Sequence, residues 1–179
     1  MLIDANSTFV ELLRDRAQQR PDEAVYTFLG DGEREVEELS YGAVDRRARA
    51  IAVALQESCS PGARVILLMP PDLSFMVGLF GCFYAGCVAV PVALPDPARL
   101  NRTLPRLLSI VRDASPEIVM TTRAVHGLLA GLFAARKVPE LQGARWLQSD
   151  SVDLTLAPSW RAPEAPPVGD APAMFQYTS

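Results

Sequence analysis

Two hydroxyl side chains at the end of the chain, Thr178 and Ser179, are the residues best placed for chemistry. They end a strand-like run at residues 173–179, and ligands of α/β sheets bind at the carboxyl ends of the strands. Hydroxyl and backbone N–H groups at such a position can bind phosphate oxygens. The Tyr-Thr-Ser spacing is unspecific by itself, so the residues alone give a phosphate-binding hypothesis and no more.

The other residues that could do chemistry are predicted to have structural roles. His126, the single histidine, has no Cys or His at metal-ligand spacing and is predicted to be an ordinary polar residue near a helix start. Asp72 and Asp96 each follow a proline after an apolar run, so both could face a crevice, but turn and helix-capping roles are favoured. Gly78 and Gly81 indicate close packing of a helix onto a strand.

Several classes of site and partner are not expected. The sequence contains no G-x-G-x-x-G, Walker A or G-x-S-x-G pattern, and we predict no catalytic residue and no metal ligand within the chain. Its net charge is -4 and its basic residues are scattered, so nucleic acid is not an expected partner. Arg99, Arg102 and Arg106 share one face of a predicted helix, which we interpret as a solvated face.

The three cysteines, Cys59, Cys82 and Cys87, are too few and of the wrong parity for a disulfide framework. Cys82 and Cys87 lie in the most apolar stretch and are predicted to be buried thiols. The first residues lack the basic-then-apolar pattern of an export signal. Together these features predict a reduced, cytoplasmic setting.

Residues 64–97 must contain the centre of the fold, since no charged residue occurs between positions 75 and 94. An apolar run at 65–69, a helix capped by Asp72 or Ser74 and ended by Gly86, and a second apolar run at 87–90 predict a buried βαβ unit. A membrane-spanning helix is disfavoured because glycines and Pro91 interrupt the stretch and no Lys or Arg cluster flanks it.

Elements on both sides of this unit complete the predicted fold. A helix should begin at Ser7 or Thr8, a second at Ser40, and others should cover residues 100–111 and 124–135. Strands are predicted at 24–29, 34–39, 116–122, 144–147 and 173–179, with a Pro/Ala-rich surface connection lacking regular structure at 157–172. The predicted class is α/β, a mostly parallel sheet with helices on both faces, preceded by a helix and a β-hairpin.

Three segments resemble the adenylate-forming enzymes. Residues 174–179, Met-Phe-Gln-Tyr-Thr-Ser, resemble the start of their phosphate-binding motif, which usually continues Gly-Ser-Thr-Gly-x-Pro-Lys-Gly. Residues 81–91 are similar to their G-x-x-x-A-G-x-V-x-V-P block, and Leu39-Ser40-Tyr41 is similar to an earlier L-S/T-Y helix start.

The fatty acyl-AMP ligase branch of that superfamily is the most similar. The residues that carry this resemblance are 26–29, the prolines 70–71 with Phe75 nearby, and Pro91 followed by 95–97. The chain reads Ala-Leu-Pro at 93–95 where the branch often has Tyr-Pro-Pro, which leaves the substrate class open.

The resemblance implies that residues 1–179 are the N-terminal portion of an AMP-binding large domain, truncated at the start of the phosphate-binding loop. It implies that ATP and Mg2+ serve to activate a fatty acid to an acyl-adenylate, which passes to the phosphopantetheine of an acyl carrier protein. Only Thr178 and Ser179 of that apparatus are present, so we predict that the 179-residue chain alone is inactive. The alternatives are a fragment of an acyl-CoA synthetase or amino-acid adenylation domain, and a non-catalytic protein-binding module.

Overall fold

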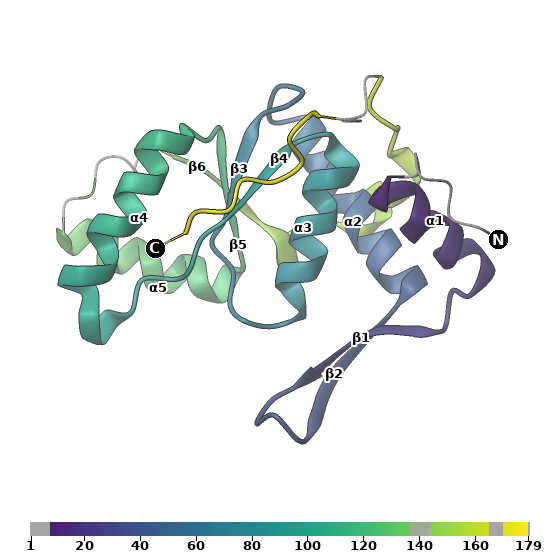
Figure 1. The fold of residues 1–179 in the computed structure, drawn as a ribbon, viewed down its shortest axis with the longest axis horizontal. Coiled ribbons are helices and arrows are strands. Elements are labelled where there is room, and N and C mark those ends of the chain that lie inside the picture. Colours follow the sequence, from purple (N-terminus) through teal and green to yellow (C-terminus); the bar gives the residue numbers. More distant parts are fainter. Residues whose placement is uncertain (1–7, 137, 139–140, 142–143, 165–169, 179) are drawn as a thin grey trace.

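The computed structural model describes residues 8–136, 138, 141, 144–164 and 170–178. It contains a four-stranded parallel sheet in the order β4-β3-β5-β6 and a separate antiparallel hairpin, β1-β2 (Figure 1). The strands are β1 Ala24–Leu29, β2 Glu35–Ser40, β3 Arg64–Leu67, β4 Val88–Pro91, β5 Ile118–Thr121 and β6 Arg145–Gln148. This architecture confirms the predicted α/β class and its preceding hairpin.

The α-helices that the described residues form in full are α1 Phe9–Gln19, α2 Tyr41–Gln56, α3 Leu73–Ala85, α4 Leu100–Ala114 and α5 Arg123–Arg136. Helices α2 to α5 lie around the sheet, and α1 packs on α2 and α3 (Figure 1). Successive strand residues point to opposite faces, and each face has its own core. Val65 and Leu67 of β3 pack in the core that contains α2 and α3, whereas Ile66 packs in the core that contains α4 and α5. Helices therefore cover both faces of the sheet, as predicted.

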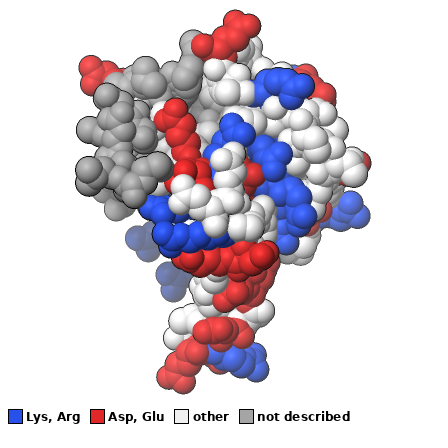
Figure 2. All heavy atoms as spheres, turned by 90° about the vertical axis from the view of Figure 1, so that its right-hand side faces the viewer, with Lys and Arg blue, Asp and Glu red and all other residues white. Residues whose placement is uncertain are grey.

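The local signals for helix starts act as expected. The Thr8 hydroxyl accepts the Glu11 N–H at 3.2 Å and the Thr8 N–H donates to the Glu11 carboxylate at 2.8 Å, which is a capping box at the start of α1. Ser40 caps α2 by accepting the Ala43 N–H at 3.3 Å. The hairpin between these helices extends away from the body, and acidic side chains gather on it (Figures 1 and 2). The predicted exposure of its second strand is confirmed.

The central βαβ unit is β3-α3-β4. Asp72 begins α3 by accepting the Ser74 N–H at 2.8 Å, and Gly86 ends it in the left-handed conformation with φ 73°. A methyl group at Gly78 would meet side chains of the sheet, as expected, but one at Gly81 would meet Ile51 of α2, so this glycine packs against a helix. Within the described part of the chain, no helix has both the length and the apolar character needed to cross a membrane.

Two predictions for the last part of the chain are wrong in part. Residues 157–159 belong to the 3-10 helix η3, Leu154–Ser159, and Trp160 is buried, because its indole ring and Nε1–H find partners on the body. Residues 165–169 lie outside the described residues. The predicted strand at 173–179 is reduced to one parallel bridge between Met174 and Ala89, and Ser179 lies outside the described residues.

Candidate functional site

The carboxyl ends of the parallel strands meet at one edge of the sheet, and three cavities surround this edge. One of about 490 Å³ is polar, one of about 450 Å³ is apolar, and one of about 500 Å³ contains arginines. Ligands of open parallel sheets bind at this edge, so these cavities are the candidate sites.

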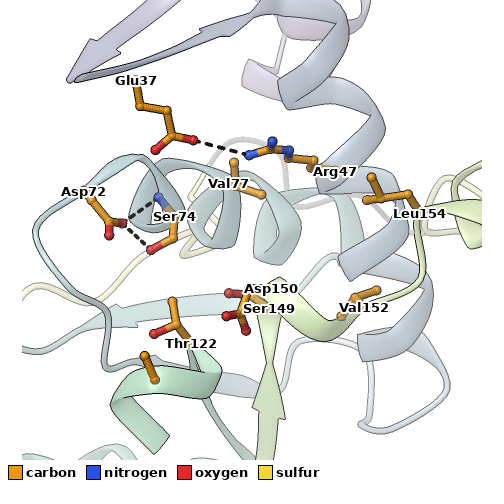
Figure 3. A pocket seen from close by; sticks show the side chains of 11 residues that line it. Glu37, Arg47, Asp72, Ser74, Val77, Thr122, Ser149, Asp150, Val152 and Leu154 are labelled. Atoms are coloured by element: carbon orange, nitrogen blue, oxygen red, sulfur yellow. Dashed lines mark hydrogen bonds and ion pairs between the residues drawn. The ribbon is translucent and has the colours of Figure 1, made fainter. Parts of the chain in front are cut away.

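The polar pocket is built by side chains that follow three strands (Figure 3). Asp72 and Ser74 come after β3, Thr122 after β5, and Ser149 and Asp150 after β6. Above them lie Glu37 of the hairpin and Arg47 of α2, with 3.8 Å between the Arg47 Nη1 and Glu37 Oε1 atoms.

Both aspartates of the polar pocket have structural partners. Asp72 accepts from the Ser74 N–H and hydroxyl, and Asp150 accepts the Arg123 N–H at 2.8 Å where α5 begins. Asp72 therefore caps a helix, as predicted, and also lines a pocket. These carboxylates already accept backbone N–H groups, so we assign them to holding the loops at the sheet edge.

The apolar groove lies beside the polar pocket, at the carboxyl ends of β3 and β4. Its lining contains Leu67 and Met69, the two prolines 70–71, Phe75, and residues 91–94. An apolar ligand would lose water-exposed surface here without leaving a polar group unpaired.

The arginine pocket shares residues 91–94 with the apolar groove. Its other lining residues are Asp96, Arg99, Arg102, Thr103, Arg106, Leu107, Ile110 and Tyr177. Asp96 caps the short 3-10 helix η1, Pro97–Arg99, by accepting the Ala98 N–H at 2.9 Å, and its carboxylate lies 3.9 Å from Arg99.

This arrangement changes the interpretation of the α4 arginines. Arg102 and Arg106 are exposed and lie four residues apart on one helix face, where like charges repel. They also line a cavity with an apolar wall, which the sequence prediction of a solvated helix face does not include. The sequence spacing placed the three arginines together, but it could not show that residues 91–94 and Tyr177 close a pocket around them. An anionic group fits this pocket by charge.

The end of the described chain runs along β4 toward the arginine pocket. Ala89 donates its N–H to the Ala173 carbonyl at 3.0 Å, and Phe175 donates its N–H to the Ala89 carbonyl at 2.9 Å. The Tyr177 hydroxyl donates to the Asp113 carboxylate, which raises the pKa of Tyr177. Tyr177 lines the arginine pocket, and the exposed Thr178 follows it directly.

The remaining candidates stay outside these pockets. His126 lies in the first turns of α5, 3.2 Å from the Gln148 side chain and with its ring 5.0 Å from that of Trp146, which confirms its predicted position near a helix start. Cys82 and Cys87 are buried as predicted. Among the described residues, no group of three or more His, Cys, Asp or Glu side chains could hold a metal ion.

Comparison with known proteins identifies the class. Residues 13–179 match the family of AMP-binding enzymes, and the chain belongs to this family. It is 40% identical over 173 residues to the medium-chain-fatty-acid–[acyl-carrier-protein] ligase JamA of Moorena producens, covering 97% of this chain and 29% of that protein. It is 32% identical over 177 residues to the long-chain-fatty-acid–AMP ligase FadD32 of Mycolicibacterium smegmatis, covering 97% of this chain and 27% of that protein.

A solved structure gives the same result for the fold. The fatty acyl-adenylate ligase from L. pneumophila, in complex with acyl adenylate and pyrophosphate, superposes with a TM-score of 0.77 and 32% identity over 95% of this chain and 28% of that one. The resemblance to adenylate-forming enzymes and to their fatty acyl branch is thereby confirmed. The chain spans less than a third of the length of these relatives.

Proposed function

We propose that this chain is the N-terminal portion, residues 1–179, of a fatty acyl-AMP ligase that uses ATP to convert a fatty acid to an acyl-adenylate. In that reaction the fatty acid carboxylate attacks the α-phosphorus and pyrophosphate leaves. The thiol of a carrier protein's phosphopantetheine then attacks the acyl carbonyl, and AMP leaves. The protein would work in the cytoplasm, in keeping with its free cysteines.

The observation that supports this proposal is the path of residues 173–178 along β4. Tyr177 lines the arginine pocket, and we propose that Thr178, which follows it, lies at the same sheet edge as this pocket and the apolar groove. One edge thus offers an apolar surface for an acyl chain and cationic groups for phosphate or carboxylate. The hydroxyls of Thr178 and Ser179 are proposed to donate hydrogen bonds to phosphate oxygens of ATP.

Mg2+ is proposed to reach the site bound to ATP, where it would neutralise charge on the polyphosphate. The described residues contribute no cluster of carboxylates to it. The residues of this chain are proposed to bind and orient the phosphates through the hydroxyls of Thr178 and Ser179, beside the arginine-lined pocket.

Fatty-acid-dependent exchange of pyrophosphate into ATP tests the proposal at two chain lengths. The protein encoded by the complete reading frame should catalyse exchange, and the 179-residue chain should stay at background. The codons after Ser179 should encode a Gly-Ser-Thr-Gly loop. Exchange by the short chain, or a stop codon directly after position 179 in the natural gene, would contradict the proposal, and the stop codon would favour a protein-binding module.

The acceptor is tested separately by product analysis of the full-length protein with fatty acid, ATP, coenzyme A and a phosphopantetheinylated carrier protein. Acyl-carrier protein should be the main product, and acyl-CoA as the main product would point to an acyl-CoA synthetase.

Thr178→Ala should lower the exchange rate about 10-fold, because one hydrogen bond to a charged group contributes roughly 1.5 kcal/mol. Thr178→Ser retains the hydroxyl and is the matched control.

A further inference from the structure

A pair of thiols lies at the opposite edge of the sheet from the candidate site. Cys59 follows the end of α2 and is half-buried, and Cys87 lies between Gly86 and the start of β4 with 3% of its surface exposed. Their two sulfur atoms are 3.6 Å apart. The pair is close in space although 28 positions separate the residues in the chain.

The backbone on both sides of this pair is fixed by hydrogen bonds. Cys59 donates its N–H to the Leu55 carbonyl at 2.9 Å, and Cys87 donates its N–H to the Cys82 carbonyl at 2.9 Å. The two segments are also joined directly, because Gly62 donates its N–H to the Gly86 carbonyl at 3.0 Å. The two cysteines are therefore held beside each other by the fold and do not meet by chance motion.

Little movement separates this contact from a covalent bond. A disulfide has a sulfur–sulfur distance of roughly 2.0 Å, so the two Sγ atoms, now 3.6 Å apart, must approach by about 1.6 Å. Cys59 lies in the turn after α2 beside the exposed Ser60. Its thiol packs against the edge of the core and donates to the Leu55 carbonyl at 3.2 Å, so bond formation exchanges this one hydrogen bond for the disulfide. Cys87 can stay in place.

The two thiols differ in a way that suits oxidation. The Cys87 thiol beside Cys59 lowers the pKa of Cys59, and this effect outweighs burial and the Glu117 carboxylate, which raise it. The contact with Cys59 and burial raise the pKa of Cys87. Cys59 is half-buried whereas Cys87 is 3% exposed, so Cys59 is the thiol that an oxidant in solution can reach, and Cys87 is placed to react with it next. Burial raises the pKa of Cys82, which keeps that thiol protonated and unreactive.

We propose that Cys59 and Cys87 are a modification site, at which a two-electron oxidant of the peroxide class joins them in a reversible disulfide. The Cys59 thiolate attacks a peroxide oxygen, the O–O bond breaks, and a sulfenic acid and water form. The Cys87 sulfur then attacks the Cys59 sulfur, and the second water leaves with the Cys87 proton. Two thiols and one hydrogen peroxide thus give one disulfide and two waters.

The bond would tie the end of α2 to the start of β4 and enclose β3 and α3. Closing this loop restricts the unfolded chain, so the oxidised protein should unfold at a higher temperature than the reduced protein. Because the pair lies at the amino edge of the sheet, the bond does not reach the arginine pocket or Thr178. This inference stands independently of the proposed function.

The test treats the 179-residue chain with hydrogen peroxide at a few equivalents, alkylates the remaining thiols with iodoacetamide, and maps the peptides by mass spectrometry. The wild type should lose two of its three thiols and give a Cys59–Cys87 cross-linked peptide that dithiothreitol removes. Cys82→Ser should give the same cross-link. Cys59→Ser and Cys87→Ser should give no intramolecular cross-link, and circular dichroism checks that each variant is folded.

The peptide map of the wild-type protein tests the proposed Cys59–Cys87 disulfide even if a variant fails to fold. The proposal would be overturned if Cys59 were found as the sulfinic acid while Cys87 stayed a thiol and was recovered as its iodoacetamide adduct. A cross-link between Cys59 and Cys82, or between two molecules at low protein concentration, would also overturn it. A melting temperature that rises on oxidation in the wild type and in Cys82→Ser, but not in Cys59→Ser, would support it.

Discussion

At the scale of single residues, one buried polar network joins three segments of the chain. The Tyr84 hydroxyl of α3 donates to Asp45 of α2 at 2.8 Å, and Arg49 binds the other Asp45 oxygen at 2.8 Å. Arg49 also donates to the Ala157 carbonyl at 3.0 Å, and the Trp160 Nε1–H donates to the Tyr84 carbonyl at 2.9 Å. The network connects α2 and α3 to η3.

Removal of the Tyr84 hydroxyl should destabilise the protein. Tyr84→Phe leaves a buried carboxylate oxygen without its tyrosine donor, and the expected loss of unfolding free energy is about 1–3 kcal/mol. Urea denaturation of the 179-residue chain measures it. Tyr26→Phe, at a half-buried tyrosine of β1, is the control and should change stability by less than about 0.5 kcal/mol. Equal stability of the two variants would refute the role of the network.

The same hydroxyl predicts a dependence on alkaline pH. Burial and the neighbouring Asp45 carboxylate raise the pKa of Tyr84 above its ordinary value of 10.0. Above pH 10 the unfolded chain loses this proton while the folded chain retains it, so stability present below pH 10 is lost as pH rises, by up to about 1.4 kcal/mol per unit. The stability difference between wild type and Tyr84→Phe should therefore shrink from pH 9 to pH 11. A constant difference across thermal melts in this range would contradict the prediction.

At the scale of elements, the packing of α3 on α2 depends on a residue without a side chain. A Cβ atom built on Gly81 would lie 2.4 Å from the Ile51 Cγ2 atom and 2.9 Å from its Cβ atom. Isoleucine is β-branched and cannot easily rotate away. The two helices can approach this closely only because position 81 is glycine.

Two alanine substitutions separate this packing effect from helix propensity. Gly81→Ala should destabilise the chain by about 1–3 kcal/mol, because overpacking outweighs the gain of roughly 1 kcal/mol that alanine gives a helix. Gly127→Ala in α5, where an added Cβ meets nothing within 4 Å, should instead stabilise by roughly 0.5–1 kcal/mol. Denaturant midpoints of the two variants should shift in opposite directions, and a stabilising Gly81→Ala would refute the close contact.

The elements that the sequence predicted correctly are those with local signals. Thr8, Ser40 and Asp72 mark helix starts because a capping side chain binds a backbone N–H two or three residues later. The burial of Trp160 could not be predicted in this way, because its partners are distant in the chain. Its ring lies 5.2 Å from that of Tyr84 and 4.7 Å from the Arg14 guanidinium carbon.

For the candidate site, too, local features could be predicted from the sequence and long-range contacts could not. The sequence predicts Thr178 at the end of a strand-like run and places the arginines at 99, 102 and 106 on one helix face. Their common pocket with residues 91–94 depends on the chain near Tyr177 running along β4, which is a long-range contact. The final strand was overpredicted because apolar residues favour a strand locally, whereas a ladder needs a partner edge along its whole length.

At the scale of the whole molecule, the edge strand β4 is the feature with the clearest consequence. In the spatial order β4-β3-β5-β6 it is an outer strand. Among the described residues, its free side is paired only through the bridge between Ala89 and Met174. Met174 is 41% and Phe175 36% exposed, and the apolar groove is lined by residues 91–94 at the carboxyl end of the same strand. Unpaired edges and apolar patches of this kind promote association between chains.

We therefore expect the isolated 179-residue chain to self-associate as its concentration rises, as measured by size-exclusion chromatography with light scattering. Met174→Lys should weaken the association, because a charge at a sheet edge opposes pairing with another edge. Leu128→Lys introduces the same charge at a 75% exposed position of α5 and is the control for a general change in solubility. If association runs through the β4 edge, only Met174→Lys shifts the apparent mass toward the monomer. Equal shifts from both variants would assign association to general apolar exposure, and a monomer at every concentration would show that the short segment from 173 to 175 is enough to protect the edge.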